Sequence, residues 1–103
     1  MLNDKEIKEY RKSIEEIDLK IVRLFKLLSD ANRFKIFVLL SKKYKISITQ
    51  IAETIKLSIP LTSQHLRILE NADMIIKEKG GKKVFPKINV ENWYVKKFIK
   101  IFN

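Results

Sequence analysis

Hydrogen-bonding and cationic side chains are closely spaced in residues 58–67. Gln64 can make two hydrogen bonds to the edge of an adenine base, and Ser63 can reach a base edge or a phosphate. Arg67 follows one helical turn further on, where contact with a phosphate is expected. The alternative interpretation is a helix face that contacts only water. The candidate duplex-binding residues of this segment are Ser58, Ile59, Pro60, Leu61, Ser63, Gln64 and Arg67.

A second basic group lies in residues 77–87, which hold five lysines and a single acidic residue, Glu78. Lys79, Lys82 and Lys83 are the candidates for contact with the backbone or minor groove of a duplex, because they flank the glycines of an expected hairpin. A solvated hairpin tip without any ligand would show the same pattern.

The chain as a whole is basic, and the excess is confined to its second part. Its 103 residues carry 22 Lys and Arg against 12 Asp and Glu, a formal net charge of +10. Residues 1–30 are balanced in charge, so residues 31–103 carry the whole excess. Such an excess favours a polyanionic partner such as nucleic acid. An AT-rich genome or a hot habitat explains the composition equally well. The charge therefore indicates a nucleic-acid partner only if a binding motif is also present.

Several kinds of chemistry are excluded by the residue types. The chain has no cysteine and one histidine, so disulfides, thiolate metal sites and thiol nucleophiles are ruled out. It also lacks a glycine-rich phosphate loop. We therefore expect no enzyme activity, no metal and no cofactor. The longest apolar run, residues 36–40, is far shorter than the roughly 20 residues of a membrane span. A soluble, cytoplasmic protein without a membrane partner is expected.

The element in front of the candidate segments is a helix over residues 31–42. Asp30 is a suitable N-cap for it, since a carboxylate can accept the free N–H groups of the first turn. Phe34, Phe37 and Val38 recur at steps of three and four, so they are expected to face the core.

Two further helices are expected on either side of a tight turn at Lys56 and Leu57. The first begins at Ser47 or Thr49 and runs through residue 55, and the second covers residues 58–71. Pro60 fits the first turn of the second helix, where its missing N–H has no partner to lose. The residues of the second helix that are spaced to face the core are Thr62, Leu66 and Leu69.

A β-hairpin follows the helices. Residues 74–79 and 82–88 are apolar and basic runs, and Gly80 and Gly81 between them predict a two-residue hairpin loop.

Apolar stripes mark both ends of the chain. From Ile7 to Leu28 apolar residues recur at steps of three and four, which predicts one helix or a pair broken near Asp18. A last helix capped by Asn89 or Asn92 is also apolar. These stripes either cover the chain's own core or form a seam with a second subunit. The candidate dimer-interface residues are Ile7, Tyr10, Ile14, Ile17, Trp93, Phe98 and Phe102.

The order helix, helix, turn, helix and basic hairpin predicts a winged helix-turn-helix. The second helix of the pair would enter the major groove, while the hairpin would reach the flanking backbone or minor groove. The expected fold is mainly α with a small β-hairpin. It forms one DNA-binding domain over residues 1–103, with dimerisation helices at both ends.

Two stretches carry a resemblance to a known family. LLSDANRFKI at residues 27–36 and SIPLTSQHLRIL at residues 58–69 are similar to segments of the ArsR family of winged-helix repressors. The resemblance extends over roughly residues 20–90. It implies a homodimer joined through the first and last helices, which binds a near-palindromic operator in double-stranded DNA and usually represses transcription.

The sequence departs from the family pattern at several positions. Many members sense metals through cysteines on the helix matching residues 31–42, or through His and Asp clusters on the last helix, and this chain has neither. A regulator without metal-thiolate sensing is therefore expected. Lys56 stands where glycine is common, so a different backbone bend is expected there. Ile59 and Leu61 replace polar residues, which favours contacts with thymine methyl groups and DNA shape over hydrogen-bonded base reading.

Two other functions fit the same pattern. A winged helix can use its recognition face to bind protein, in which case Ile59 and Leu61 would anchor the interface. A nonspecific nucleic-acid-binding protein would keep the basic surface without preferring any duplex sequence.

Overall fold

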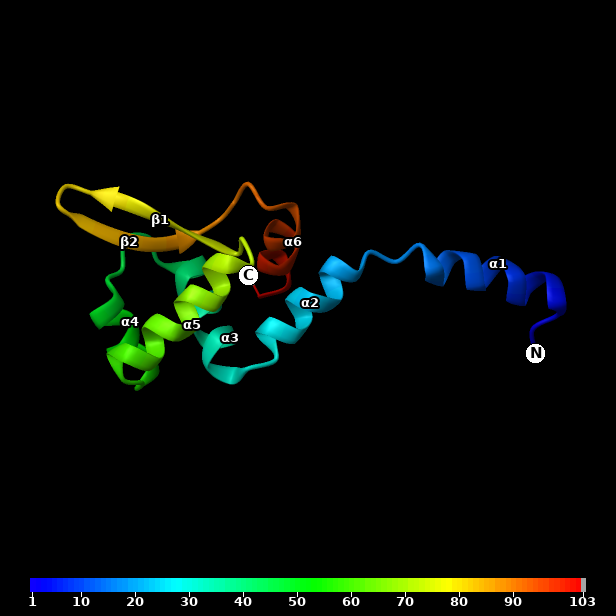
Figure 1. The fold of residues 1–103 in the computed structure, drawn as a ribbon, viewed down its shortest axis with the longest axis horizontal. Helices are drawn as coiled ribbons and strands as arrows, with labels where there is room; N and C mark the ends of the chain where they lie inside the picture. The colour runs from blue at the N-terminus through cyan, green and yellow to red at the C-terminus, as the bar shows by residue number, and fades with distance from the viewer. Residues whose placement is uncertain (103) are drawn as a thin grey trace.

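The computed structural model describes residues 1–102, and its element order matches the winged helix-turn-helix expected from the sequence. Helices gather around a short hairpin, and one helix extends away from them (Figure 1). The elements are α1 (Asp4–Glu15), α2 (Leu19–Leu28), α3 (Ala31–Lys42), α4 (Ile48–Ile55), α5 (Ile59–Asn71), β1 (Ile75–Gly80), β2 (Lys83–Ile88) and α6 (Trp93–Phe102).

The N-terminal stripe is divided between two helices. Asn3 caps α1 through a capping box with Glu6, and Asp18 caps α2 by accepting a hydrogen bond from the Lys20 N–H. No residue of α1 is buried. The radius of gyration is 17.6 Å, whereas a compact domain of this length has about 13 Å. The apolar face of α1 thus has no partner within the described part of the chain.

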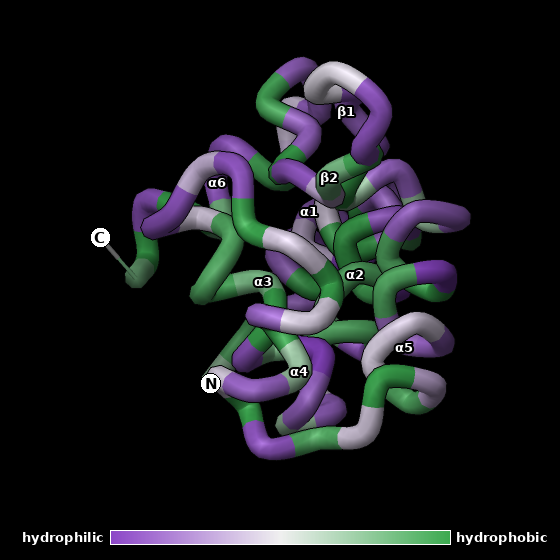
Figure 2. Tube along the Cα trace, turned by 90° about the vertical axis from the view of Figure 1, so that its left-hand side faces the viewer, coloured by the Kyte–Doolittle hydropathy of each residue, from purple (hydrophilic) through white to green (hydrophobic). Residues whose placement is uncertain are grey.

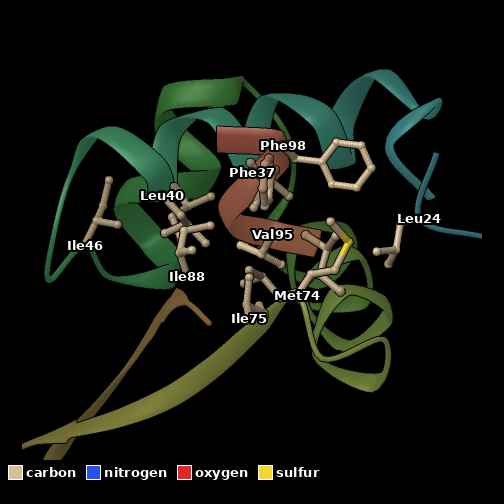
Figure 3. Packing of buried hydrophobic residues seen from close by; sticks show 13 residues of the cluster. Leu24, Phe37, Leu40, Ile46, Met74, Ile75, Ile88, Val95 and Phe98 are labelled. Carbon is tan, nitrogen blue, oxygen red and sulfur yellow. The ribbon is translucent and has the colours of Figure 1, made fainter. Parts of the chain in front are cut away.

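The core surrounds α3, which contacts α2, α4, α5, β2 and α6. Its buried residues are Ile36, Phe37 and Leu40, and Figure 3 shows Phe37 and Leu40 among side chains of α6 and the strands. The expected inward face was therefore only partly right. Phe34 is 37% exposed and Val38 is half-buried, because elements packed on several sides of α3 select a face rotated from the one we expected.

The pair α4 and α5 forms the expected helix-turn-helix. Ser47 begins α4 with a capping box to Gln50, and Ser58 begins α5 by accepting from the Leu61 N–H. Ala52 is almost fully buried, so its small side chain allows close helix packing. Lys56 has a φ of 58°. The expectation of a different bend was wrong, because lysine here adopts the left-handed conformation that glycine favours.

The hairpin is an antiparallel pair whose loop lies one residue later than expected. Gly80 pairs with Lys83, so the loop residues are Gly81 and Lys82 rather than the two glycines. Gly81 has a φ of +66°, a conformation suited to a tight hairpin loop. A Cβ on Gly80 would lie 2.8 Å from the Phe85 ring. Gly80 therefore belongs to the strand and makes room for an aromatic ring.

The last helix, α6, closes the core. Asn92 caps it by accepting a hydrogen bond from the Tyr94 N–H at 3.0 Å. Val95 and Phe98 are buried, and the Phe98 ring meets the edge of Phe25 of α2 at a centroid distance of 5.0 Å. Within residues 1–102 none of the helices combines the length and apolar character needed to cross a membrane.

Candidate nucleic-acid interface

The face of α5 opposite the core carries the side chains predicted to contact DNA. Thr62, Leu66 and Leu69 are buried as expected, which turns the other side of the helix outward. In Figure 2, α5 forms one side of the molecule and the hairpin lies above it. Ser63 is half-buried, and the exposed residues are Ser58, Ile59, Pro60, Leu61, Gln64 and Arg67.

A side-chain contact at His65 joins α5 to α3, and a hydrogen bond within α5 supports its first turn. The Thr62 hydroxyl donates to the Ser58 carbonyl at 2.8 Å. Arg33 Nε donates to the Leu27 carbonyl at 2.8 Å, while its Nη1 lies 3.3 Å from His65 Nδ1. His65 is half-buried and contacts α3 through Arg33. The only histidine therefore links the recognition helix to the core helices.

The lysines at the hairpin tip have no compensating carboxylates. Lys79, Lys82 and Lys83 are exposed, and none of the three makes an ion pair in the part of the chain that the structure describes. Lys77 and Lys87, at the base of the hairpin, instead pair with Glu70 and Glu78 at 3.7 and 3.5 Å. The free positive charge of the hairpin thus lies where a duplex backbone could reach it.

Part of the predicted α5 surface faces a groove between α5 and the hairpin, although the lining of this groove does not include Lys79, Lys82 or Lys83. This cavity has a volume of about 330 Å³. Ser63 and Arg67 line it from α5, and Lys77 and Val84 line it from the strands. The fold therefore brings residues from separate parts of the sequence to one surface, as expected for a helix that enters the major groove beside a wing.

A contact that sequence reasoning missed holds the hairpin in place. The Tyr44 hydroxyl, in the loop between α3 and α4, donates to Glu78 Oε2 of β1 at 2.6 Å. This hydrogen bond lowers the pKa of the Glu78 carboxyl, with help from nearby Lys87, and it raises the pKa of the Tyr44 phenol. The two residues are far apart in sequence, so no local pattern signals the contact.

The candidate dimer residues differ in how much surface they offer. Ile7, Tyr10, Ile14, Ile17 and Trp93 are exposed, and Phe102 is half-buried against the rings of Phe34 and Phe37. Phe98 is only 4% exposed, because it packs in this chain's own core, and it has almost no surface left for a partner. On α2 and α6, the further exposed apolar residues outside this candidate set are Leu19, Val22, Phe25 and Ile101.

The side chains present do not fit a thiolate metal site. Residues 1–102 contain no group of three or more His, Cys, Asp or Glu side chains that could hold a metal ion. The chain also has no cysteine.

Comparisons with known proteins agree with this geometry. A family described as winged helix-turn-helix DNA-binding matches residues 29–76. The chain is 37% identical over 79 residues to the cadmium resistance transcriptional regulatory protein CadC of Listeria innocua, which covers 77% of this chain and 60% of that relative. It spans about 60% of the length of the curated relatives that it matches.

Solved structures share the fold over most of its length. The transcriptional regulator HlyU of Vibrio vulnificus has a TM-score of 0.76 at 25% identity, covering 90% of this chain and 94% of that one. A homodimeric winged helix-turn-helix DNA-binding domain of Mycobacterium bovis, described as a possible ArsR-family regulator, has a TM-score of 0.67 at 17% identity. It covers 99% of this chain and 84% of that one.

The fold and its outward helix define the class as a winged helix-turn-helix DNA-binding protein. Within that class, the family match and the curated relatives support a regulator of the ArsR family.

Proposed function

We propose that this protein is a cytoplasmic, sequence-specific regulator of transcription that binds double-stranded DNA as a homodimer, most simply as a repressor. Its operator is near-palindromic, because two copies related by a twofold axis present two identical recognition helices. Helix α5 enters the major groove and the hairpin contacts the flanking backbone.

The observation that carries this proposal is the exposed edge of α5 together with a hairpin tip whose lysines make no ion pair within residues 1–102. Gln64 is exposed on that edge and can read adenine, while Arg67 and the lysines at the hairpin tip meet phosphates. Ile59 and Leu61 are 48% and 46% exposed, which supports apolar contacts with thymine methyl groups.

The signal that releases the operator is proposed to be something other than a thiolate-bound metal. The Listeria relative is named for cadmium resistance. This chain has no cysteine with which to make a thiolate metal site, so another ligand or condition shifts its DNA affinity.

Selection of bound fragments from a random duplex pool, with mass measurement in solution, tests the proposal. A single enriched motif with inverted symmetry and a dimeric complex are expected. Gln64→Ala should then reduce discrimination between the selected operator and random duplex by about 1–3 kcal/mol, since one bidentate contact is lost. Equal losses on both duplexes would contradict base reading by Gln64.

Protein binding through the same face is the competing function, and exposed Ile59 and Leu61 are what favour it. Binding measured at several ionic strengths distinguishes DNA binding from protein binding. DNA binding weakens with salt with a log–log slope of about 0.9 per phosphate contacted, whereas an apolar protein interface hardly responds. Recovery of no duplex at low salt would favour the protein-binding function.

A further inference from the structure

A second basic surface lies outside the interface described above. It is a cavity of about 860 Å³ between α2, the end of α5 and the start of α6. Figure 1 shows these three segments meeting near the middle of the molecule. The cationic side chains that line the cavity are Lys20, Arg23, Lys26 and Arg33.

The positive charge of this cavity is largely uncompensated. Lys20, Arg23 and Lys26 make no ion pair with any residue from 1 to 102, and Arg33 is 3.9 Å from Asp30. Asp73 is the one carboxylate among the lining residues, and the carboxylates of Asp18 and Asp30 lie behind the wall, beside Tyr94 and Arg33. Three unpaired cations on one flank of a short helix repel each other, and a bound anion would relieve that repulsion.

The walls of the cavity are cross-linked by hydrogen bonds. The Tyr94 hydroxyl of α6 donates to the carboxylate of Asp18 at the start of α2. Asn92 Nδ2 donates to the Asp73 carbonyl at 2.9 Å, which ties the start of α6 to the end of α5. Arg33 is fixed by its bond to the Leu27 carbonyl. The cationic groups are therefore carried by a framework that is in place before a ligand arrives.

We propose that this cavity binds a phosphate group. Arginine and lysine together suit that ligand, because the guanidinium can donate two parallel hydrogen bonds while ammonium groups supply compact charge. Asn71 adds a polar side chain, and Leu24 and Leu27 give an apolar floor for whatever carries the phosphate. The phosphate belongs either to the operator backbone, which rests on the proposed function, or to a free phosphorylated small molecule, which does not.

The test compares Arg23→Gln/Lys26→Gln with a control that removes the same charge elsewhere. Lys8→Gln/Lys12→Gln is that control, since both lysines are exposed on α1. Lys20→Gln/Lys26→Gln is a second cavity variant that retains Arg23. Circular dichroism verifies that each variant is folded. Inorganic pyrophosphate is titrated into each protein by calorimetry, and binding to the selected duplex is measured across a salt series.

Each source of phosphate predicts its own result. A free ligand predicts pyrophosphate binding that is about tenfold weaker in both cavity variants and unchanged in the control. A backbone contact predicts about tenfold weaker duplex binding in the cavity variants than in the control. It also predicts a salt slope lower by about 0.9 for each phosphate lost.

Cavity variants that match the control in both titrations would overturn the proposal. If the wild-type protein binds no duplex at any salt, the proposed function fails, and the pyrophosphate titration alone decides whether the cavity binds phosphate.

Discussion

Lys56 is held in a backbone conformation that suits glycine better than lysine. It ends α4 with a φ of 58°, and the turn is closed by the Leu57 N–H donating to the Ala52 carbonyl at 3.0 Å. A Cβ in this left-handed region costs about 1–2 kcal/mol, partly offset by the extra freedom that glycine gives the unfolded chain. We expect Lys56→Gly to raise the free energy of unfolding by about 0.5–1 kcal/mol.

Urea denaturation measures this change, and Lys35→Gly is the matched control. Lys35 is exposed within α3, so the same replacement there should lower the free energy of unfolding by about 1 kcal/mol. A loss of stability in Lys56→Gly would mean that the lysine side chain makes a stabilising contact which outweighs the backbone cost.

Asp30 makes the stability of the fold depend on pH. Its pKa is lowered chiefly because its carboxylate accepts a hydrogen bond from the Arg33 N–H at 3.0 Å, and also by the nearby Arg33 guanidinium. A folded pKa below the unfolded value of about 3.9 means stabilisation above that value, which is lost as pH falls through the folded pKa.

Asp30→Asn isolates that contribution because asparagine keeps the N-cap acceptor and removes the charge. The free energy of unfolding should differ most between wild type and variant near neutral pH, and the difference should shrink as the pH falls below about 4. Urea titrations at a series of pH values measure it. A difference that stays constant with pH would show that the charge of Asp30 does not contribute.

At the scale of the elements, the hairpin depends on the loop between α3 and α4 for its position. Tyr44 and Lys87 both bond to Glu78, so the loop and both strands meet at one carboxylate. We expect Tyr44→Phe to speed amide hydrogen exchange in β1 and β2, because the strands lose a tether and form a sheet of only two strands. Exchange in α4 should stay unchanged, since Ser47 and Gln50 still cap it.

The pKa of Tyr44 gives a second check on the same contact. Glu78→Gln removes the charged acceptor that raises the pKa of the phenol, so this pKa should fall toward its ordinary value of about 10. Ultraviolet titration of the tyrosines follows it. An unchanged pKa of Tyr44 in Glu78→Gln would show that the loop and the hairpin do not make this contact in solution.

The sequence predicted those elements whose ends are fixed by neighbouring residues. Asp30 was correctly identified as a cap because an N-cap acts within three residues of itself. The hairpin loop was misplaced by one residue. Two adjacent glycines indicate a turn, but they do not show whether both lie in the loop or one lies in a strand. The strand role of Gly80 depends on the Phe85 ring across the sheet. The buried face of α3 and the Tyr44–Glu78 contact depend on distant elements, which no local spacing reveals.

Within the candidate site, what could be predicted was which residues face outward. The four- and three-residue steps of Thr62, Leu66 and Leu69 fixed the buried side of α5, and the opposite side followed. The basic cavity beside α2 could not be found this way, because Arg23 and Arg33 come together only when α2 and α3 pack.

At the scale of the whole molecule, contacts within the single chain do not account for the stability of α1. It has twelve residues, buries none of them, and extends to give a long axis of 61 Å. Isolated helices of this length are marginal in water, so most of their stability must come from packing of an apolar face. The homodimer that we propose supplies that packing by covering Ile7, Tyr10 and Ile14 with a second copy.

Ile14→Glu tests this coupling between helix and assembly. Ile14 is 65% exposed in the single chain, so a glutamate there leaves the core intact but introduces a charge into the proposed seam. Sedimentation equilibrium should report a mass near the 12.2 kDa of one chain instead of twice that value, with a loss of helical circular dichroism as α1 unfolds. Lys8→Glu introduces the same side chain at another exposed position of α1 and should remain dimeric.

Because two recognition helices must bind one operator together, Ile14→Glu should also bind the selected duplex more weakly, although each hairpin keeps its lysines. A monomeric wild type with an intact α1 would contradict both the seam and the paired reading of the operator.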